Sequence, residues 1–428
     1  MLVLRRMAWS VMSLVACLGL LWAIPRFGLL NSRSGPTSHE RFREDFPERA
    51  TLSLRGGFMA SEPSIRVGLK ESPVASFMLA VNGPFQVRDL TDERVLWQAK
   101  SLPRCRVVVG AKGIELGNQR FATGSVEVVA ATPPAIWVDQ AQYRGSLRIT
   151  RAPGNRVLPV NVLPLEQYLA SVVDSEMPAA FPEEARRAQA IVARTYALYQ
   201  RLQSNPKGFV DVYASTRSQK YRGYQYEDEK GRLLAGESAS SRATVEATRG
   251  LIGTHRGDLF CTYYCAVCGG STVDGQKVFP DAAPPLQSVL CDHCREARLY
   301  RWQVRVARRE AEELFRAAAR KKGKTFGTLR ELQGIRGRLG DYRLRDQQGE
   351  IELTGAEIRQ ALSGKGLSSP RFTIREQGNE LLFEGQGHGH GVGLCQWGAR
   401  GLAQQGWTAR RIFAYYYPGS QLADAGYR

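Results

Sequence analysis

The chain has 428 residues, of which 43% are hydrophobic and 9% aromatic. This length is enough for two or three domains, and the composition excludes a collagen-like or broadly disordered chain. The formal net charge of +18 favours polyanionic partners, namely nucleic acid, an anionic membrane face or an acidic wall polymer, although a basic surface can also serve solubility alone. The sequence has no zinc-finger, helix-turn-helix or aromatic-basic RNA motif, so we expect no nucleic-acid partner.

The N-terminal segment predicts export from the cytoplasm. Arg5 and Arg6 precede an uncharged apolar run over residues 7–24, and a polar linker follows at 26–50. A helix over that run would be roughly 27 Å long, close to the hydrocarbon thickness of a bilayer. We therefore expect residues 1–25 to form a signal anchor, a single helix in the cytoplasmic membrane with the rest of the chain extracytoplasmic. The alternatives are a cleaved signal peptide and a lipoprotein signal ending at Cys17, both of which also export the chain.

Residues 51–150 are expected to form a β-rich accessory domain. Short apolar runs separated by turn residues recur at 64–69, 106–109, 113–116, 126–129 and 145–149. The sequence contains no tandem repeat.

The pattern changes after residue 150. Apolar residues at helical spacing predict a helix over 164–174, which Pro178 prevents from continuing, and a second helix over 182–203. A charged helix over 308–321 and a strand over 380–384 are also expected. The predicted fold class is α+β: an N-terminal membrane helix, a β-rich accessory region, and a mixed α/β domain over residues 151–425.

Three motifs in the mixed α/β domain are distinctive in their order and spacing. The first is LPLEQYLASVVDSEMP at 163–178 with AQAIVARTYA at 188–197, the second is CGGST at 268–272, and the third is GHGVGLCQWGA at 389–399 with YYPG at 416–419. Read together, they resemble the family of stage II sporulation protein D and the amidase enhancers. The resemblance covers residues 150–425 and leaves out the preceding region.

The resemblance implies a catalytic domain with a glycan-binding cleft. It implies a lytic transglycosylase acting on peptidoglycan glycan strands, in sporulating relatives on strands stripped of their stem peptides. Some relatives are described only as enhancers of cell-wall amidases, so a non-catalytic, glycan-binding enhancer with an amidase partner is the alternative. The family's catalytic glutamate falls on Glu176, and the arginine of the same motif falls on Arg194.

Glu176 has a chemistry that suits this role. Cleavage of a glycosidic bond needs a proton on the leaving oxygen, which a protonated carboxyl group can supply. We expect Glu176 just past the end of helix 164–174, where the partial negative charge of the helix disfavours a carboxylate. Arg194 is expected to orient Glu176 or to steady the developing charge. The alternative is that Glu176 is a helix-end residue with a local hydrogen bond.

The number of carboxyl groups distinguishes two kinds of glycan cleavage. A hydrolase normally needs a second carboxylate, for which Asp174 is the nearest candidate. A transglycosylase needs only one, because the 6-hydroxyl of the substrate attacks the anomeric carbon. The lone glutamate is therefore more consistent with intramolecular transfer.

Cysteines form a second constellation. Two CxxC pairs, Cys265 with Cys268 and Cys291 with Cys294, are 22 residues apart, which is typical of a tetrahedral thiolate zinc site. We predict that these four bind a structural Zn²⁺, since four thiolates leave no open position for water. Disulfides are the alternative in an oxidising compartment. Cys395 is expected to be a small buried apolar residue.

The remaining candidates are substrate contacts. His390 lies between glycines that permit a close approach to a sugar, and it matches a family histidine; the alternative is a buried histidine that holds a turn. Gln219 and Tyr221, within the segment SQKYRG at 218–223, are expected to line the cleft. The second and third motifs add Thr272 and Gln396 to the predicted substrate-binding residues.

Overall fold

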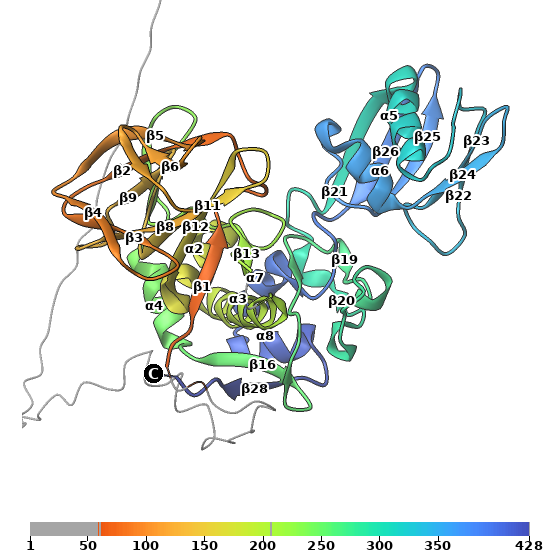
Figure 1. Cartoon of the computed structure of the whole chain (residues 1–428). Coiled ribbons are helices and arrows are strands. Elements are labelled where there is room, and N and C mark those ends of the chain that lie inside the picture. Colours follow the sequence, from red (N-terminus) through yellow and green to blue (C-terminus); the bar gives the residue numbers. More distant parts are fainter. Residues whose placement is uncertain (1–58, 60, 206–207, 428) are drawn as a thin grey trace, which may run out of the picture. The chain divides into compact units, whose positions relative to one another are not determined.

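The structure is a computed structural model, and it describes residues 59, 61–205 and 208–427 (Figure 1). The expected signal anchor at 1–25 and the linker at 26–50 lie outside these residues. In the part that the structure describes, no helix is both long enough and apolar enough to cross a membrane. The described chain is mixed α/β and rich in strands.

Two large sheets account for most of the strands. Along β2 and β8, every second residue is buried, as expected for strands with one face on a hydrophobic core. The seven-stranded sheet has the order β13-β1-β12-β11-β8-β3-β4. Its strands are β1 (Ser64–Gly68), β3 (Phe85–Asp89), β4 (Val95–Ala99), β8 (Ser125–Ala130), β11 (Ser146–Ala152), β12 (Arg156–Pro164) and β13 (Val212–Tyr213).

The eight-stranded sheet has the order β15-β14-β10-β9-β2-β5-β6-β7. Its strands are β2 (Ser76–Val81), β5 (Leu102–Gly110), β6 (Gly113–Leu116), β7 (Gln119–Phe121), β9 (Ile136–Val138), β10 (Ala141–Tyr143), β14 (Gln225–Glu227) and β15 (Leu233–Ala235).

The boundary expected near residue 150 does not separate two hydrophobic cores. Strand β1 pairs with β12 from Ser64 opposite Pro164 to Gly68 opposite Val160, so strands from both sides of residue 150 share one sheet. One buried cluster likewise contains Ile65 together with Val172 of the following helix. The β-rich region and the first helices of the expected catalytic domain are therefore packed as one body.

The helices that follow agree closely with those predicted. Strand β12 leads directly into α2 (Leu165–Glu176), and α3 (Glu183–Gln203) follows after a short turn. Glu176 is thus the last residue of its helix, not a residue beyond it. Helix α3 is buried over most of its length and packs against α2, α4 (Ala239–Ala247), α7 (Gln396–Gln404) and α8 (Ala409–Tyr416).

Short elements connect α4 to the cysteine-rich region. One small sheet contains β16 (Leu251–His255), β17 (Asp258–Leu259) and β28 (Gln421–Asp424). Strand β18 (Tyr264–Cys265) pairs with β27 (Leu394–Cys395), and β19 (Gly270–Ser271) pairs with β20 (Leu290–Cys291). Three single turns of 3-10 helix are η1 (Gly275–Lys277), η2 (Pro284–Leu286) and η3 (Asp292–Cys294).

Residues 301–386 form a lobe with a hydrophobic core of its own, which we call the inserted lobe. Its sheet of β21 (Arg301–Ala307), β26 (Glu380–Gln386) and β25 (Phe372–Gln377) packs against α5 (Arg308–Lys321). It also contains β22 (Glu331–Gly334), β23 (Tyr342–Arg345), β24 (Glu350–Leu353), α6 (Gly355–Ala361) and η4 (Ser363–Lys365). The predicted charged helix and the final strand are confirmed as α5 and β26.

Candidate functional site

Glu176 is half-buried at the C-terminal end of α2, where three chain segments meet. Its Oε1 accepts a hydrogen bond of 2.8 Å from the backbone N–H of Lys220. Its Oε2 lies 3.4 Å from Nε2 of Gln396, the first residue of α7. The same amide nitrogen lies 3.4 Å from Oε1 of Gln189 on α3. The carboxyl group is therefore held by side-chain and backbone groups from distant parts of the sequence, and it remains partly accessible.

A buried polar network supports the segment that carries Lys220. The Tyr168 hydroxyl donates to Oε1 of Gln219 at 3.1 Å, and Nε2 of Gln219 donates to the hydroxyl of Tyr264 at 3.3 Å. Burial raises the pKa of Tyr264 well above its usual value, and the charge of Glu176 acts in the same direction. Tyr264 therefore stays protonated beside the carboxyl group.

Gln219 and Tyr221, both predicted to contact substrate, lie inside the protein. Gln219 is fully buried, and Tyr221 is buried with its hydroxyl donating to Oδ1 of Asn161 at 2.7 Å. These two residues therefore hold the 219–223 segment against α2 and β12. Lys220, between them, provides the direct contact with Glu176.

Arg194 is not in contact with Glu176. Its guanidinium forms a two-pronged ion pair with Glu166, with Nε to Oε1 at 2.9 Å and Nη2 to Oε2 at 2.7 Å, and it also donates to the carbonyl of Leu251. Burial acts to raise the pKa of Glu166, but the nearby guanidinium outweighs it and keeps that pKa below its usual value. Tyr427 also donates to Glu166, at 2.7 Å. The expected catalytic arginine therefore serves to join α2, α3 and the C-terminal segment.

Asp174 is also occupied elsewhere. Its carboxylate forms an ion pair with the buried guanidinium of Arg186, and its Oδ2 accepts a hydrogen bond of 2.6 Å from the N–H of Ser238. Since residues two apart on a helix point in different directions, Asp174 and Glu176 do not face each other. Asp174 is thus bound to the residue that precedes α4.

His390 holds the glycine-rich turn. Its Nδ1 accepts a hydrogen bond of 3.0 Å from the N–H of Val392, and its ring also bonds to the backbone of Tyr264. The edge of the ring faces Phe279, with 5.0 Å between the centroids. Burial lowers the pKa of His390 to about 4, so the ring is neutral at ordinary pH. These contacts match the alternative of a turn-holding histidine.

Thr272 has a similar structural role. It is almost fully buried, and its Oγ1 accepts a hydrogen bond of 2.7 Å from the N–H of Val289. Of the five residues predicted to bind substrate, Gln396 alone among the described contacts reaches Glu176.

Four buried cysteines form a compact thiol cluster: Cys268, Cys291, Cys294 and Cys395. Their sulfur atoms all lie within 4.8 Å of one another, and those of Cys268 and Cys294 are 3.7 Å apart. Thiolates at ~2.3 Å from a tetrahedral zinc ion lie about 3.8 Å apart, so the spacing fits such an ion. All seven cysteines that the structure describes are free thiols, not disulfides.

The predicted ligand set was wrong at one position, because Cys395 takes the place of Cys265. Cys265 is buried on β18, where it pairs with Cys395 across the β18–β27 ladder, but its sulfur lies outside the cluster. The prediction of Cys395 as a simple apolar residue was therefore also wrong. The CxxC spacing gave no indication of a ligand about a hundred residues further along the chain.

Backbone and side-chain donors surround the thiol cluster. Sγ of Cys395 accepts hydrogen bonds of 3.3 Å from the N–H groups of Cys268 and Gly398, and the Tyr416 hydroxyl lies 3.1 Å from Sγ of Cys291. A Cβ on Gly398 would lie 2.5 Å from Sγ of Cys291, so only glycine permits α7 to approach so closely. Such donors stabilise the thiolates that a metal requires.

Comparison with known proteins identifies the family. Residues 154–255 match the stage II sporulation protein domain, and residues 286–393 match a domain of unknown function. Stage II sporulation protein D of Bacillus subtilis is 30% identical over 282 residues, which cover 62% of this chain and 76% of that protein. The chain belongs to the stage II sporulation protein D family.

Two further relatives differ in how far the similarity extends. An uncharacterized protein of Brachyspira hyodysenteriae is 29% identical over 368 residues, which cover 85% of this chain and 94% of that protein. The amidase enhancer of Bacillus subtilis is 21% identical over 302 residues, covering 60% of this chain and 40% of that protein. The first motif, with Glu166, Glu176 and Arg194, lies within the matched sporulation-protein domain.

Sequence reasoning missed Lys220 and Tyr264 beside Glu176, and Gln189, which contacts the amide of Gln396. Lys220 acts through its backbone N–H, which leaves no trace in residue type. Gln189 lies inside the AQAIVARTYA motif, and its polar side chain on an otherwise buried helix face was the signal that could have identified it.

Proposed function

We propose that this protein is a peptidoglycan lytic transglycosylase with Glu176 as its general acid and base. It would cleave the glycosidic bond between N-acetylmuramic acid and N-acetylglucosamine and leave 1,6-anhydro-muramic ends. The observation that supports this most is the half-buried carboxyl group of Glu176, held by Lys220 and Gln396 where the first and third motifs meet.

The geometry suits a carboxyl group that gives and then takes a proton. The fixed N–H of Lys220 makes Oε1 an acceptor in either state, which leaves Oε2 to carry the proton. The amide of Gln396 beside Oε2 can donate to a carboxylate or, turned over, accept from a carboxyl group. Protonated Glu176 would give its proton to the leaving oxygen as the bond to the anomeric carbon breaks.

In the second step the muramyl 6-hydroxyl would attack the anomeric carbon and pass its proton to the Glu176 carboxylate. The carboxyl group is restored, and no water enters the product. The pairing of Asp174 with Arg186 supports this route over hydrolysis, because the candidate second carboxylate nearest in sequence is already bound to a cation.

The thiol cluster would hold a structural Zn²⁺ through Cys268, Cys291, Cys294 and Cys395. An ion bound there would form four bonds that fix separate chain segments. It would have no open coordination position for chemistry. Cys395 directly precedes Gln396, so the cluster would also fix the amide that contacts Glu176.

The proposed substrate lies outside the cytoplasmic membrane. The charged start and apolar run of residues 5–24 support export with the bulk of the chain extracytoplasmic, either anchored or after signal cleavage. The net charge of +18 would favour an acidic wall polymer in that compartment.

A second candidate, favoured by the similarity to the amidase enhancer, is a glycan-binding protein that activates a cell-wall amidase without cutting glycan itself. The two functions predict different results for one substitution. With purified glycan strands, Glu176→Gln should lower the cleavage rate by about 10² or more, the usual contribution of a general acid. Strand binding and thermal unfolding should change little.

A matched control is Glu183→Gln, which removes an exposed carboxylate from the start of α3. It should cleave at the unmodified rate. If the unmodified protein binds strands but creates no new ends, the enhancer function replaces the enzyme. If Glu176→Gln cleaves normally, another residue is the acid.

A further inference from the structure

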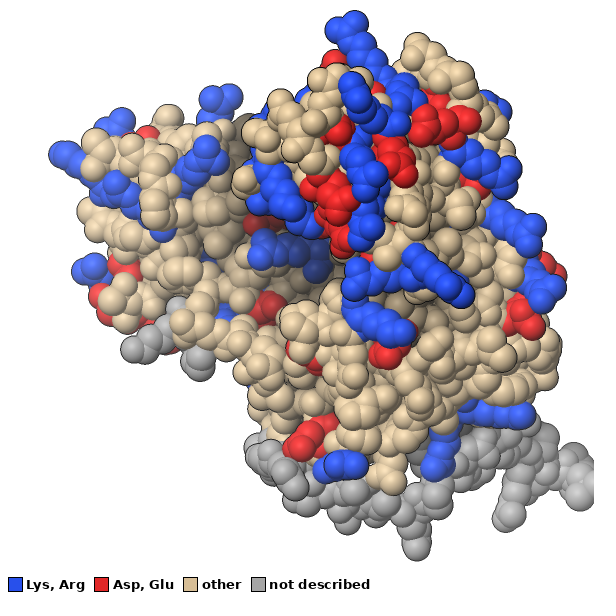
Figure 2. All heavy atoms as spheres, turned by 90° about the vertical axis from the view of Figure 1, so that its right-hand side faces the viewer, with Lys and Arg blue, Asp and Glu red and all other residues tan. Residues whose placement is uncertain are grey.

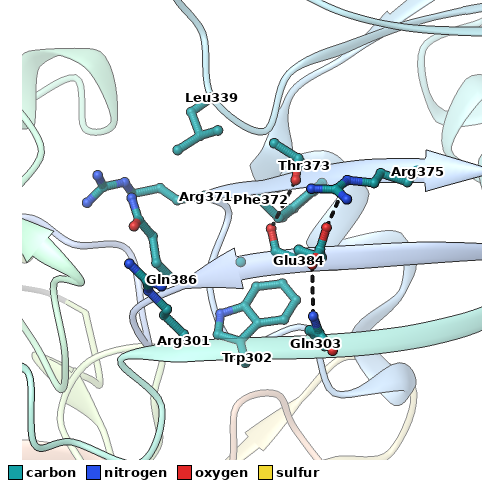
Figure 3. Close-up of a pocket in the computed structure, with 11 residues that line it drawn as sticks. Arg301, Trp302, Gln303, Leu339, Arg371, Phe372, Thr373, Arg375, Glu384 and Gln386 are labelled. Carbon is teal, nitrogen blue, oxygen red and sulfur yellow. Dashed lines mark hydrogen bonds and ion pairs between the residues drawn. The ribbon is translucent and has the colours of Figure 1, made fainter.

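The inserted lobe has a hollow of about 620 Å³ on the polar face of its three-stranded sheet. Arg301 and Gln303 point to this face of β21, while Trp302 between them is part of the core of the lobe. Cross-strand pairing places Gln386 opposite Arg301, and Glu384 opposite both Gln303 and Thr373. The hollow is lined by Arg301, Trp302, Gln303, Leu339 and Phe372 with Arg371, Thr373, Arg375, Glu384, Gly385 and Gln386 (Figure 3).

The two ends of the hollow differ in charge. At one end, Glu384 accepts a hydrogen bond of 2.8 Å from Gln303 and pairs with Arg375 at 3.0 Å, so charges there are balanced. At the other end, Arg301, Arg371 and Gln386 lie together, as Figure 3 shows.

The cationic end has no carboxylate partner among the described residues. Arg371 donates to the backbone carbonyls of Cys268 and Ser271, both at 2.8 Å, which fixes its position without neutralising its charge. Arg301 is exposed, and its guanidinium has no hydrogen-bond or ion-pair partner among the residues that the structure describes, although its backbone pairs with Gln386.

Several other arginines of the inserted lobe have a carboxylate partner. Arg343 pairs with Glu352 at 2.7 Å, and Arg345 pairs with Glu331 at 3.0 Å. Figure 2 shows one face of the molecule, on which Asp and Glu lie among the Lys and Arg side chains in some places, while Lys and Arg stand without them in others. Arg301 and Arg371 line the same hollow with no acid between them, and two guanidinium groups so placed can bind one anion from outside the lobe.

We propose that this hollow binds a carboxylate-bearing sugar of the glycan strand, and so forms a second glycan site on the inserted lobe. A guanidinium fork matches a carboxylate geometrically, and muramic acid has a lactyl carboxylate that is free wherever no peptide is attached. Gln303, Gln386 and Thr373 offer the amide and hydroxyl groups that bind sugar hydroxyl and acetamido groups.

The size of the hollow and its position along the chain agree with that ligand. A volume of 620 Å³ is within the usual range of roughly 300–1,000 Å³ for small-ligand sites, enough for one or two sugar rings. The chain enters the lobe after Cys294 and leaves it just before His388, and the segment that leaves the lobe continues to Gln396. A glycan strand bound to the lobe is therefore bound next to the chain segment that leads to Gln396. This inference rests on the proposed function only for the identity of the strand.

Binding by the whole protein tests the proposal. The Glu176→Gln background keeps strands intact, and calorimetry measures the Kd for peptide-free glycan strands and for the same strands with their carboxylates converted to neutral amides. Arg301→Ala should weaken binding of the charged strands by about tenfold or more, the usual effect of losing a hydrogen bond to a charged group. Arg301→Lys should restore only part of this, because it keeps the charge but not the fork.

The matched control is Arg320→Ala, which removes the same charge from the exposed side of α5, the helix that packs on the opposite face of the sheet. It should change Kd less than about twofold, as is usual for an exposed charge. Equal effects of Arg301→Ala and Arg320→Ala on Kd would overturn the proposal. So would an equal Kd for charged and neutral strands in the protein that keeps Arg301. If binding depends on Arg301 but the unmodified protein never cleaves strands, the proposed activity is overturned and this site remains. If the unmodified protein cleaves strands but Arg301→Ala does not weaken binding, this site is overturned and the proposed activity remains.

Discussion

At the scale of single residues, the contacts of Glu176 explain how one carboxyl group could serve two proton transfers. A fixed backbone donor occupies Oε1, and a reversible amide faces Oε2. Sequence identified Glu176 and Gln396 through their motifs, but not their pairing, since the two are 220 residues apart.

Arg194 shows why a motif residue need not take part in chemistry. It shares the first motif with Glu176, yet it is fully buried and paired with Glu166. Removing one member of a buried ion pair leaves the other charge unpaired at a cost of about 3–5 kcal/mol, so a structural pair is as strictly specified as a catalytic group. Sequence pattern alone cannot separate the two roles.

His390 gives a prediction for the pH dependence of stability. Its pKa is about 4 in the folded protein and near its ordinary value of about 6.5 in the unfolded chain. Between these values the unfolded chain binds a proton that the folded protein does not. Lowering the pH from 6.5 towards 4 should therefore reduce the free energy of unfolding, by up to about 1.4 kcal/mol per pH unit.

Urea unfolding of the unmodified protein and of His390→Gln measures this contribution. The variant should show a shallower loss of stability below pH 6.5. The pH-dependent part of the difference should vanish at pH 8, where the histidine is neutral in both states. Identical slopes for the two proteins would show that His390 is not the buried neutral group described.

At the scale of elements, local periodicity predicted the helices, whose limits depend on residues close together in the sequence. Helices α3 and α5 begin and end within one residue of their expected limits, because their apolar spacing and flanking residues are local signals. Strand pairing is not local: Ser64 pairs with Pro164 across about a hundred residues. The boundary at residue 150 was therefore a change in local pattern, not a division between packed domains.

The thiol cluster gives a prediction for metal binding. Cys395→Ser should lose bound zinc, while Cys265→Ser, directly opposite Cys395 on β18, should keep about one equivalent per chain. Elemental analysis after gel filtration measures the difference, and a thiol count in denaturant without reductant excludes disulfides. Zinc lost from Cys265→Ser but kept by Cys395→Ser would restore the ligand set expected from the CxxC pairs.

At the scale of the whole molecule, the inserted lobe lies between the second and the third motif in the chain. It begins after three cysteines of the thiol cluster and ends before Cys395, which completes that cluster. The cluster therefore joins chain segments on either side of roughly ninety residues. A cross-link that closes a long loop reduces the entropy of the unfolded chain more than one that closes a short loop. This arrangement keeps the third motif beside Glu176 although the lobe separates it from the second in sequence.

If Glu176 breaks the glycan strand without using water, the new ends contain no oxygen atom from the solvent. Incubation of the unmodified protein with peptide-free glycan strands in H₂¹⁸O, followed by mass spectrometry of the new ends, tests this directly. We predict 1,6-anhydro ends, lighter by one water than hydrolytic ends and free of ¹⁸O. New reducing ends that contain ¹⁸O, or no new ends at all, would contradict the account.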